Sequence, residues 1–536
     1  MRRTLGSAWQ RAACLLACAA SVLAASGCSV IVNTEEREAC ATHKECTDRF
    51  HEPSACINSQ CTKLLTPECT EIWPANAMSQ DNVLLIGFLG ALAGNFASYG
   101  TPTKEGAELA LSEIEASTNG LSAPTNSRTG QRHLAMLVCD HGSDPARVAR
   151  HLVENAGVQA IIGDSFSTAT LDMFDQVAKP AGVFVLSPSA TSPALTEHPD
   201  EGLLWRTSPS DVVQAETLKF LVRDVEDALH AQGELADGER AKIAMPTKHD
   251  SAGLGLARAA TAAPETDSGA PAVDPGLPDD YPDPDDPKTG EVDWQSHIAH
   301  ILDYSPNIIL AMGTGEFVTS MLQGIENGWN PARTRPWYLL PEGDRVTELA
   351  TLVGKAENAH LNLNERIIGT APGARKSPLY DSFQNSFRSA FGRRDPGNLA
   401  EFGYDAAYLV AYAIAIANQV SPSGRELASA MQHVSCKEGD GPNKPTPVPA
   451  GTNNFSGYFR IAANGDCIDF EGASGPLDFD PDTGEALSDI AMWCVRRNPA
   501  GGFGFEPPLK GFYSVVERSI VENTIDLSQR GWCTDQ

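Results

Sequence analysis

The chain has 536 residues, of which 42% are hydrophobic and 7% are aromatic. This length is too great for a single hydrophobic core and predicts two or more domains, while the composition is that of an ordinary folded protein. The formal net charge is −29. It argues against binding to nucleic acid and to anionic lipid surfaces, because both carry negative charge themselves.

The first residues have the pattern of an export signal. Arg2, Arg3 and Arg11 precede an apolar run over residues 12–25, and small residues follow it. The run is shorter than the ~20 residues that a membrane-spanning helix needs, so the pattern predicts a secretory signal peptide at residues 1–27. The mature protein is expected to be exported to the periplasm.

The end of this segment, from Leu23 to Cys28, resembles a bacterial lipobox, in which the cysteine is lipidated. We expect Cys28 to carry a lipid anchor and residues 28–39 to form a tether, with ordinary cleavage near Ala25 as the alternative. Ser29 is not the aspartate that favours retention in the inner membrane of some bacteria. Attachment to the outer membrane is therefore favoured over the inner membrane.

Ten cysteines follow Cys28. An even number in an exported chain predicts disulfides, here among Cys40, Cys46, Cys56, Cys61, Cys69, Cys139, Cys436, Cys467, Cys494 and Cys533. The early group predicts a small disulfide-bonded module at residues 40–69. A zinc site is the alternative, which the absence of paired CxxC spacing disfavours, and no metal is expected. Proximity in the sequence suggests the pairs Cys436–Cys467 and Cys494–Cys533.

The rest of the chain alternates between two patterns. Short apolar runs at residues 83–87, 134–139, 158–162 and 183–186 predict strands buried on both faces, and helical patterns separate them. The alternation resumes after Arg206, with strands at 242–245 and 307–312. It predicts an α/β fold of parallel sheets flanked by helices, with ligands bound at the carboxyl ends of the strands. Residues 264–287 are acidic and rich in proline, which predicts a disordered insertion.

Several stretches then carry a resemblance to a known family. They include Tyr99-Gly100 after the first strand, Ser165-Phe166-Ser167-Thr168 after the third, Ser187-Pro188-Ser189-Ala190-Thr191 after the fourth, Pro341-Glu342-Gly343, and Tyr404-Asp405-Ala406-Ala407-Tyr408. From about residue 82 onward the chain resembles the branched-chain amino-acid-binding proteins, the type I periplasmic solute-binding family of ABC transporters.

The resemblance implies two lobes, each a parallel sheet flanked by helices, joined by three hinge crossings. It places residues 82–206 and 343–435 in the first lobe and residues 207–342 and 436–536 in the second. The crossings are expected near Arg206, near Glu342 and after Gln419. The lobes would close on a ligand by a hinge motion.

The candidate site lies where the first lobe's strands end. Ser167 and Thr168 follow a strand and begin a helix, where hydroxyls and free N–H groups form an anion site. The resemblance implies that Ser167 holds a ligand carboxylate and that Ser189 and Thr191 contact carboxylate and ammonium. The full expected set is Tyr99, Ser165, Phe166, Ser167, Thr168, Ser189, Ala190, Thr191 and Glu316. Glu316 is the candidate for the ammonium, with a structural glutamate as the alternative.

The second lobe departs from the family, because residues 248–253 lack the aromatic side chain that relatives use there. The expected ligand is therefore an amino acid, an amide or another small polar solute. The expected function is binding of this ligand, as a monomer, for an ABC permease. The alternative is a surface lipoprotein that senses a ligand or binds a partner. Hydrolase, metalloprotease and nucleotide-binding motifs are missing, so neither catalysis nor a cofactor is expected.

Overall fold

The computed structural model describes residues 39–124, 127, 130–263, 270–286, 288–373, 377–437, 444–451, 455–498, 501–505, 509, 511–521, 525–529 and 531–533. The predicted signal peptide, Cys28 and nearly all of the predicted tether lie outside these ranges. Among the described residues, no helix combines the length and the apolar character that crossing a membrane requires.

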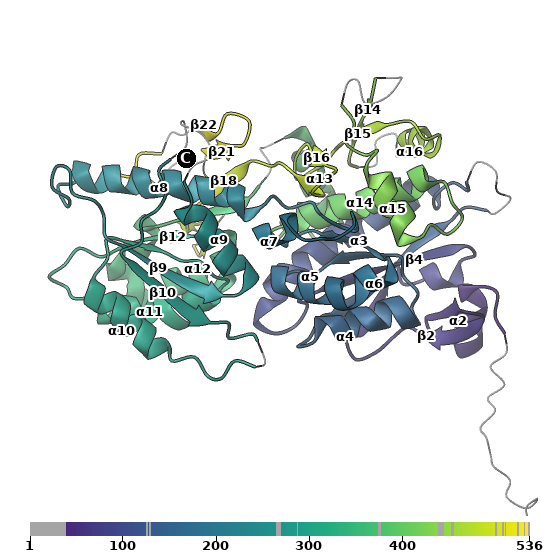
Figure 1. Ribbon diagram of the computed structural model, residues 1–536, viewed down its shortest axis with the longest axis horizontal. Coiled ribbons are helices and arrows are strands. Elements are labelled where there is room, and N and C mark those ends of the chain that lie inside the picture. Colours follow the sequence, from purple (N-terminus) through teal and green to yellow (C-terminus); the bar gives the residue numbers. More distant parts are fainter. Residues whose placement is uncertain are drawn as a thin grey trace, which may run out of the picture.

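A small module precedes the lobes. Helix α2 (His43–Phe50) packs on the antiparallel hairpin of β1 (Ser54–Ile57) and β2 (Gln60–Lys63). Two disulfides, Cys40–Cys56 and Cys46–Cys61, hold helix and hairpin together. Figure 1 shows this module at the outer end of the first lobe, away from the second. A segment this short buries too little apolar surface to be stable alone. The two disulfides supply the stability that a hydrophobic core would otherwise provide.

The first lobe is assembled from two separate stretches of the chain. The first stretch contains β3 (Cys69–Trp73), η2 (Ala77–Ser79), β4 (Val83–Gly90), η3 (Gly94–Phe96), α3 (Ala97–Thr118), β5 (His133–Asp140), α4 (Pro145–Arg150), η4 (His151–Asn155), β6 (Ala160–Gly163), α5 (Ser167–Met173), η5 (Phe174–Ala178), α6 (Lys179–Ala181), β7 (Phe184–Ser187), α7 (Pro193–Thr196) and β8 (Leu204–Arg206). The second stretch adds α13 (Pro378–Ala390), α14 (Ala400–Ala417), α15 (Gly424–Met431), β14 (Thr446–Pro449), α16 (Phe455–Ala463), β15 (Ile468–Glu471), β16 (Phe479–Asp480) and β17 (Glu485–Ala486).

The second lobe begins where the chain leaves β8. Its elements are α8 (Asp211–Ala231), β9 (Ile243–His249), α9 (Ser251–Thr261), β10 (Leu277–Pro282), α10 (Trp294–Tyr304), β11 (Ile308–Leu310), η6 (Phe317–Leu322), α11 (Gln323–Gly328), β12 (Trp337–Leu340), η7 (Glu342–Asp344), α12 (Thr347–Gly354), η8 (Ala356–Leu361), η9 (Leu363–Glu365) and β13 (Ile367–Pro372). The C-terminal part contributes β18 (Ile490–Trp493), β19 (Arg496–Arg497), β20 (Phe503–Gly504), β21 (Phe512–Ser514) and β22 (Ser519–Val521).

Each lobe is built on one sheet, and within the described residues each sheet has eight strands. The strand order is β16-β17-β8-β7-β6-β4-β5-β3 in the first lobe and β10-β9-β11-β12-β13-β18-β21-β22 in the second. The central strands pair in parallel, whereas β3 and β18 join antiparallel. The lobes lie side by side with helices on their faces (Figure 1). The predicted two-lobed α/β fold is confirmed.

The chain passes between the lobes three times, between β8 and α8, between β13 and α13, and between β17 and β18. Two of the predicted lobe boundaries are wrong. Residues 343–372 belong to the second lobe, because β13 pairs with β12. Residues 446–486 belong to the first lobe, because β17 pairs with β8 and the segment before it packs on α14. The positions of these crossings follow only from the pairing of strands that are distant in the sequence.

The boundary of the cysteine-rich module also needs correction. Cys69 was expected inside it, but this residue begins β3, an edge strand of the first lobe's sheet. Its disulfide reaches Cys139 on the neighbouring strand β5. The two suggested pairs, Cys436–Cys467 and Cys494–Cys533, are confirmed.

The acidic stretch at 264–287 was expected to be disordered throughout. Residues 264–269 and 287 lie outside the described residues, but Leu277–Pro282 forms β10, which pairs in parallel with β9 at the edge of the sheet. Asp279 and Tyr281 point inward and are buried, while their neighbours are exposed or half-buried. An edge strand tolerates proline because one side of its backbone has no partner strand. The prediction of disorder from composition is therefore wrong at Leu277–Pro282, which forms a strand.

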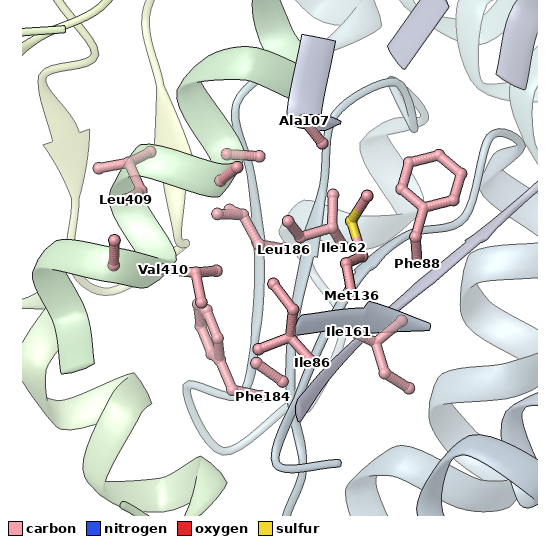
Figure 2. Packing of buried hydrophobic residues seen from close by; sticks show 14 of the residues in the cluster. Ile86, Phe88, Ala107, Met136, Ile161, Ile162, Phe184, Leu186, Leu409 and Val410 are labelled. Atoms are coloured by element: carbon pink, nitrogen blue, oxygen red, sulfur yellow. The ribbon is translucent and has the colours of Figure 1, made fainter. Parts of the chain in front are cut away.

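The core of the first lobe lies between its sheet and the helix pair α3 and α14. Figure 2 shows Ile86, Ile162 and Leu186 of the sheet packing beside Leu409 and Val410 of α14. The two helices approach each other at glycines. A Cβ atom on Gly403 of α14 would lie 2.0 Å from the carbonyl oxygen of Thr103 in α3. Close packing of the helices therefore requires a residue without a side chain at this position.

This contact predicts a stability defect. Alanine is the better helix former by about 1 kcal/mol, yet we expect Gly403→Ala to lower the free energy of unfolding by about 2 kcal/mol through overpacking. Gly290→Ala is the control, because a Cβ atom there meets nothing within 4 Å. Urea unfolding followed by circular dichroism measures both. Equal midpoints for the two variants would show that the helices separate without cost.

Candidate functional site

Hydroxyl side chains gather where β6 and β7 end. The Ser165 Oγ accepts a hydrogen bond from the N–H of Ala91 at 3.0 Å, and the Ser189 Oγ donates to the Ser165 carbonyl at 3.1 Å. Ser167 is the first residue of α5, and its Oγ accepts from the N–H of Ser192 at 3.1 Å. All three serine side chains are buried. The structure thus brings these predicted residues together at the carboxyl edge of the sheet.

Thr191 connects this edge to the first crossing. Its carbonyl accepts the N–H of Asp211 at 2.8 Å, and its side chain forms a hydrogen bond with the Asp211 carboxyl group. The neighbouring Ala190 carbonyl accepts from the Arg206 guanidinium at 3.3 Å, and Arg206 also pairs with Glu485. The predicted residues Ala190 and Thr191 therefore lie beside the hinge.

Asp211 in turn lies beside a carboxyl group of the second lobe, Glu342. Burial and the Glu342 carboxylate raise the pKa of Asp211 well above its usual value, although Thr191 and Arg206 act against this. Burial likewise raises the pKa of Glu342, whose Oε2 accepts a hydrogen bond from the Gln214 amide at 2.7 Å. Two carboxyl groups in one poorly solvated place favour sharing a proton or a cation.

The two lobes touch beside this region. The hydroxyls of Thr168 and Ser251 are 2.9 Å apart, and the Ser192 Oγ donates to the Ser251 carbonyl at 2.6 Å. On the other side, the Tyr99 hydroxyl donates to the Gly343 carbonyl. Thr168 and Tyr99, two predicted site residues, thus form contacts between the lobes.

Aromatic side chains of the first lobe pack against the second lobe's core. Phe166 is surrounded by Phe96, Tyr99 and His141, at ring-centroid distances of 5.4, 5.6 and 5.9 Å. Burial alone lowers the pKa of His141, but the Asp164 carboxylate, 2.9 Å from its Nδ1, raises it above the ordinary value. The cluster supplies an apolar surface with one polar edge.

The second lobe contributes a buried ammonium group. The Lys248 Nζ at the end of β9 lies 2.9 Å from Asp285, 3.2 Å from Asp283 and 3.4 Å from Asp250. Burial alone would lower the pKa of Lys248, but these carboxylates and Glu316 raise it above its usual value. Lys248 is therefore held charged by its acidic neighbours.

Glu316 is placed differently from the other predicted residues. Its carboxylate accepts hydrogen bonds from the Tyr281 hydroxyl at 2.6 Å, from the Thr314 N–H at 2.9 and 3.0 Å, and from the Thr314 hydroxyl at 3.0 Å. Burial raises its pKa, and the Lys248 charge and these donors oppose the rise. Both oxygens are engaged within the lobe, which favours the structural role left open above.

Sequence reasoning missed several groups at this interface, namely Phe96, His141, Asp211, Lys248 and Glu342. Lys248 lies near the end of β9, and the others lie between a strand and the helix that follows it or at the start of a helix. From the sequence, Glu342 is predicted only to lie near a hinge crossing. Its place directly after an apolar strand was the available signal.

The sequence of the chain matches known proteins. A family model described as periplasmic binding protein matches residues 84–463. The Leu/Ile/Val-binding protein of Citrobacter freundii is 29% identical over 167 residues, which are 30% of this chain and 42% of that protein. A Leu/Ile/Val-binding protein of Rhizobium johnstonii is 30% identical over 146 residues, 27% of this chain and 37% of that protein. The chain thus spans about two fifths of the curated relatives it matches.

The fold matches solved structures over a longer range. A branched-chain amino acid transporter substrate-binding protein of Streptococcus pneumoniae, in complex with isoleucine, aligns with a TM-score of 0.54 at 18% identity, covering 79% of this chain and 99% of the other. A leucine-binding protein of Thermotoga maritima aligns with a TM-score of 0.55 at 17% identity, covering 79% and 98%. A solute-binding protein of Rhodopseudomonas palustris, in complex with 3,4-dihydroxybenzoic acid, aligns with a TM-score of 0.53 at 16% identity. The alignment covers 79% of this chain and 96% of the other.

The matching stretch contains all the predicted ligand-binding positions, and the aligned structures share the two-lobed architecture. The resemblance drawn from the sequence is thereby confirmed, and the chain belongs to the periplasmic binding protein family.

Proposed function

We propose that the protein binds a small polar solute, an amino acid or a related compound, between its lobes as the substrate-binding component of an ABC importer. The observation that carries this proposal is the pairing of two chemistries at the interface. Hydroxyl groups of Ser167 and Thr191 lie on one lobe, and the Asp211–Glu342 carboxyl pair lies beside them. The Ser167 hydroxyl offers a donor to a ligand carboxylate, the Thr191 hydroxyl donates to Asp211 and orients it, and the carboxyl pair offers acceptors to an ammonium group.

The positions of the groups explain why Ser167 would bind the carboxylate and the carboxyl pair would bind the ammonium group. Ser167 begins α5, so the free N–H groups of that helix add to its hydroxyl in attracting an anion. Among the described residues, Asp211 and Glu342 form no ion pair with a lysine, and Lys248 is paired with its own acidic neighbours. Arg206 is the cation that acts on Asp211. An ammonium ion placed between them would relieve the repulsion of the pair. The ligand would thus be oriented by its own charge separation.

The ligand class remains broader than branched-chain amino acids. Solved relatives with this fold hold isoleucine in one case and 3,4-dihydroxybenzoic acid in another, so the fold alone does not select the solute. In this chain the apolar surface comes from Phe96, Tyr99 and Phe166 of the first lobe. The second lobe offers polar and acidic groups in its place. This division favours a compact solute with one apolar end and one cationic end.

The proposal includes the setting in which the protein acts. A signal peptide at residues 1–27 and lipidation of Cys28 would export the chain and anchor it in the periplasm, with the outer membrane favoured. We further propose that it acts as a monomer and binds its ligand without catalysing a reaction. A permease in the inner membrane would be the receiving partner.

Loss of both candidate hydroxyls tests the site. Ser167→Ala combined with Thr191→Ala should abolish the shift of the unfolding midpoint that the ligand produces, because the donor to the ligand carboxylate and the hydroxyl that orients Asp211 are both removed. The screen covers amino acids, amides, short peptides and organic acids. Ligand at 100 times Kd stabilises the native state by about 2.7 kcal/mol.

The same substitutions also remove internal hydrogen bonds, worth about 1 kcal/mol each, so unfolding without ligand is compared first. Thr351→Ala, an exposed hydroxyl on α12 in the second lobe, is the matched control and should bind normally. Undiminished affinity in the double variant would refute the site. A wild type that responds to no compound would refute solute binding and favour a sensor or partner-binding lipoprotein.

The carboxyl pair predicts how affinity depends on pH. The pKa values of Asp211 and Glu342 are both raised, so lowering the pH protonates them earlier than ordinary carboxyl groups and removes the charge that attracts an ammonium group. The affinity for an amino acid should therefore fall as the pH is lowered from 7.5 towards 5, measured by isothermal titration calorimetry. Glu342→Gln should bind more weakly at pH 7.5 and show a flatter profile.

Other titratable groups face the same place, namely Arg206 and Asp250. Arg206 keeps its charge throughout this range. Asp250→Asn is the variant with which Glu342→Gln is compared, because the Asp250 carboxyl group also caps α9 and pairs with Lys248. An affinity independent of pH in the wild type would contradict the assignment of the ammonium to this pair.

A further inference from the structure

A second group of polar side chains lies in the second lobe, on elements other than those of the interlobe site. Asp279 lies on β10, and His297 and His300 lie on α10, three residues apart and therefore on one helical face. The Nδ1 of His297 is 3.0 Å from Asp279 Oδ2, and the Nδ1 of His300 is 3.3 Å from Asp279 Oδ1. Each oxygen of one carboxylate thus faces its own imidazole nitrogen.

These spacings match those of ligands on a common metal ion. Zinc binds imidazole nitrogen and carboxylate oxygen at about 2.0–2.2 Å, so two ligands of one tetrahedral site lie about 3.3 Å apart. The three ligand atoms here all lie within 4.8 Å of one another. Small rotations of the side chains would bring them onto one ion. Two imidazoles with one carboxylate form a donor set that suits divalent transition metals.

The surroundings leave one side of the cluster accessible. The side chains of Asp279 and His297 are 9% and 15% exposed, whereas that of His300 is 58% exposed. The rings of Tyr281 and Trp294 lie 6.0 and 6.5 Å from the His297 ring. An ion could therefore enter from solvent beside His300 and complete its coordination with water.

We propose that Asp279, His297 and His300 form a binding site for a divalent transition-metal ion, with Zn²⁺ as the probe. Without metal, each imidazole donates its Nδ1–H to Asp279. With metal, the ring proton resides on Nε2 and the Nδ1 lone pair binds the ion. Asp279 then binds the metal directly and no longer accepts the two hydrogen bonds.

The site would fasten the acidic insertion to the second lobe. Strand β10 carries Asp279 and, two residues later, Tyr281, which donates to Glu316. Asp283 and Asp285 follow and pair with Lys248. A metal joining β10 to α10 would therefore hold in place the segment that completes the charge network at the end of β9.

Metal retention provides the test. The protein is treated with EDTA, incubated with Zn²⁺ in excess Mg²⁺ to suppress weak binding to its acidic surface, and passed through gel filtration. We expect one Zn²⁺ per chain and a higher unfolding midpoint than in the metal-free protein. His300→Ala and Asp279→Asn should weaken Zn²⁺ binding at least about 10-fold, the smaller of the losses seen even for partners outside the coordination shell.

His360→Ala, an exposed histidine on another helix, is the control and should retain the ion. His300 is more than half exposed, so its removal leaves the core intact, and an unchanged circular dichroism spectrum verifies this. Two results would overturn the proposal. One is a wild-type protein that retains no Zn²⁺ and shows no change in midpoint, and the other is equal retention by the wild type and His300→Ala.

Discussion

The arrangement of the second lobe depends on one buried ammonium group. Lys248 lies at the carboxyl end of β9 with its side chain 4% exposed, and a lone charge in such a place would cost several kcal/mol. Asp250, Asp283 and Asp285 surround it. These carboxylates come from the start of α9 and from the segment after β10, so a single charge ties the acidic insertion to the edge of the sheet. The insertion is ordered there because its acids have a counter-ion.

This dependence explains why the sequence was misleading at the insertion. Asp279, Asp283 and Asp285 alternate with proline, and by composition alone such a segment buries too little apolar surface to fold. Its order comes from Tyr281, which is buried beside Glu316, and from the ion pairs with Lys248. Both are contacts between distant segments, and no local pattern contains them.

The parts of the fold that could be predicted are those determined by short-range sequence patterns. Buried strands such as Val83–Gly90 and Phe184–Ser187 are apolar runs, and the helix that begins after Asp144 carries a cap and a proline in the sequence itself. The pairs Cys436–Cys467 and Cys494–Cys533 followed from proximity. The later crossings did not, because β13 and β17 are recognised as members of different lobes only through the strands with which they pair.

The candidate site divides in the same way. Its first-lobe half, Ser165 to Thr168 and Ser189 to Thr191, follows directly after strands and could be located from the sequence and the resemblance. Its second-lobe half depends on which carboxyl group faces the hinge. The order of residues along the chain predicts Glu316 for this place, but the oxygens of Glu316 accept hydrogen bonds from Tyr281 and Thr314. Glu342 lies beside Asp211 instead, a proximity created by the folding of both lobes around the first crossing.

The raised pKa values of three buried carboxyl groups connect protonation to stability. Asp211, Glu342 and Asp344 all have raised pKa values, chiefly through burial and also, for Asp211 and Asp344, through neighbouring carboxylates. A carboxyl group whose pKa is higher in the folded state binds more protons there than in the unfolded chain, so its ionisation lowers stability as the pH rises through the intervening range. Wherever these groups are ionised, the folded state therefore holds their negative charge at a cost. Under the proposed function, a bound cation would offset that cost, and closure around an ammonium-bearing solute would be favoured by the same electrostatics.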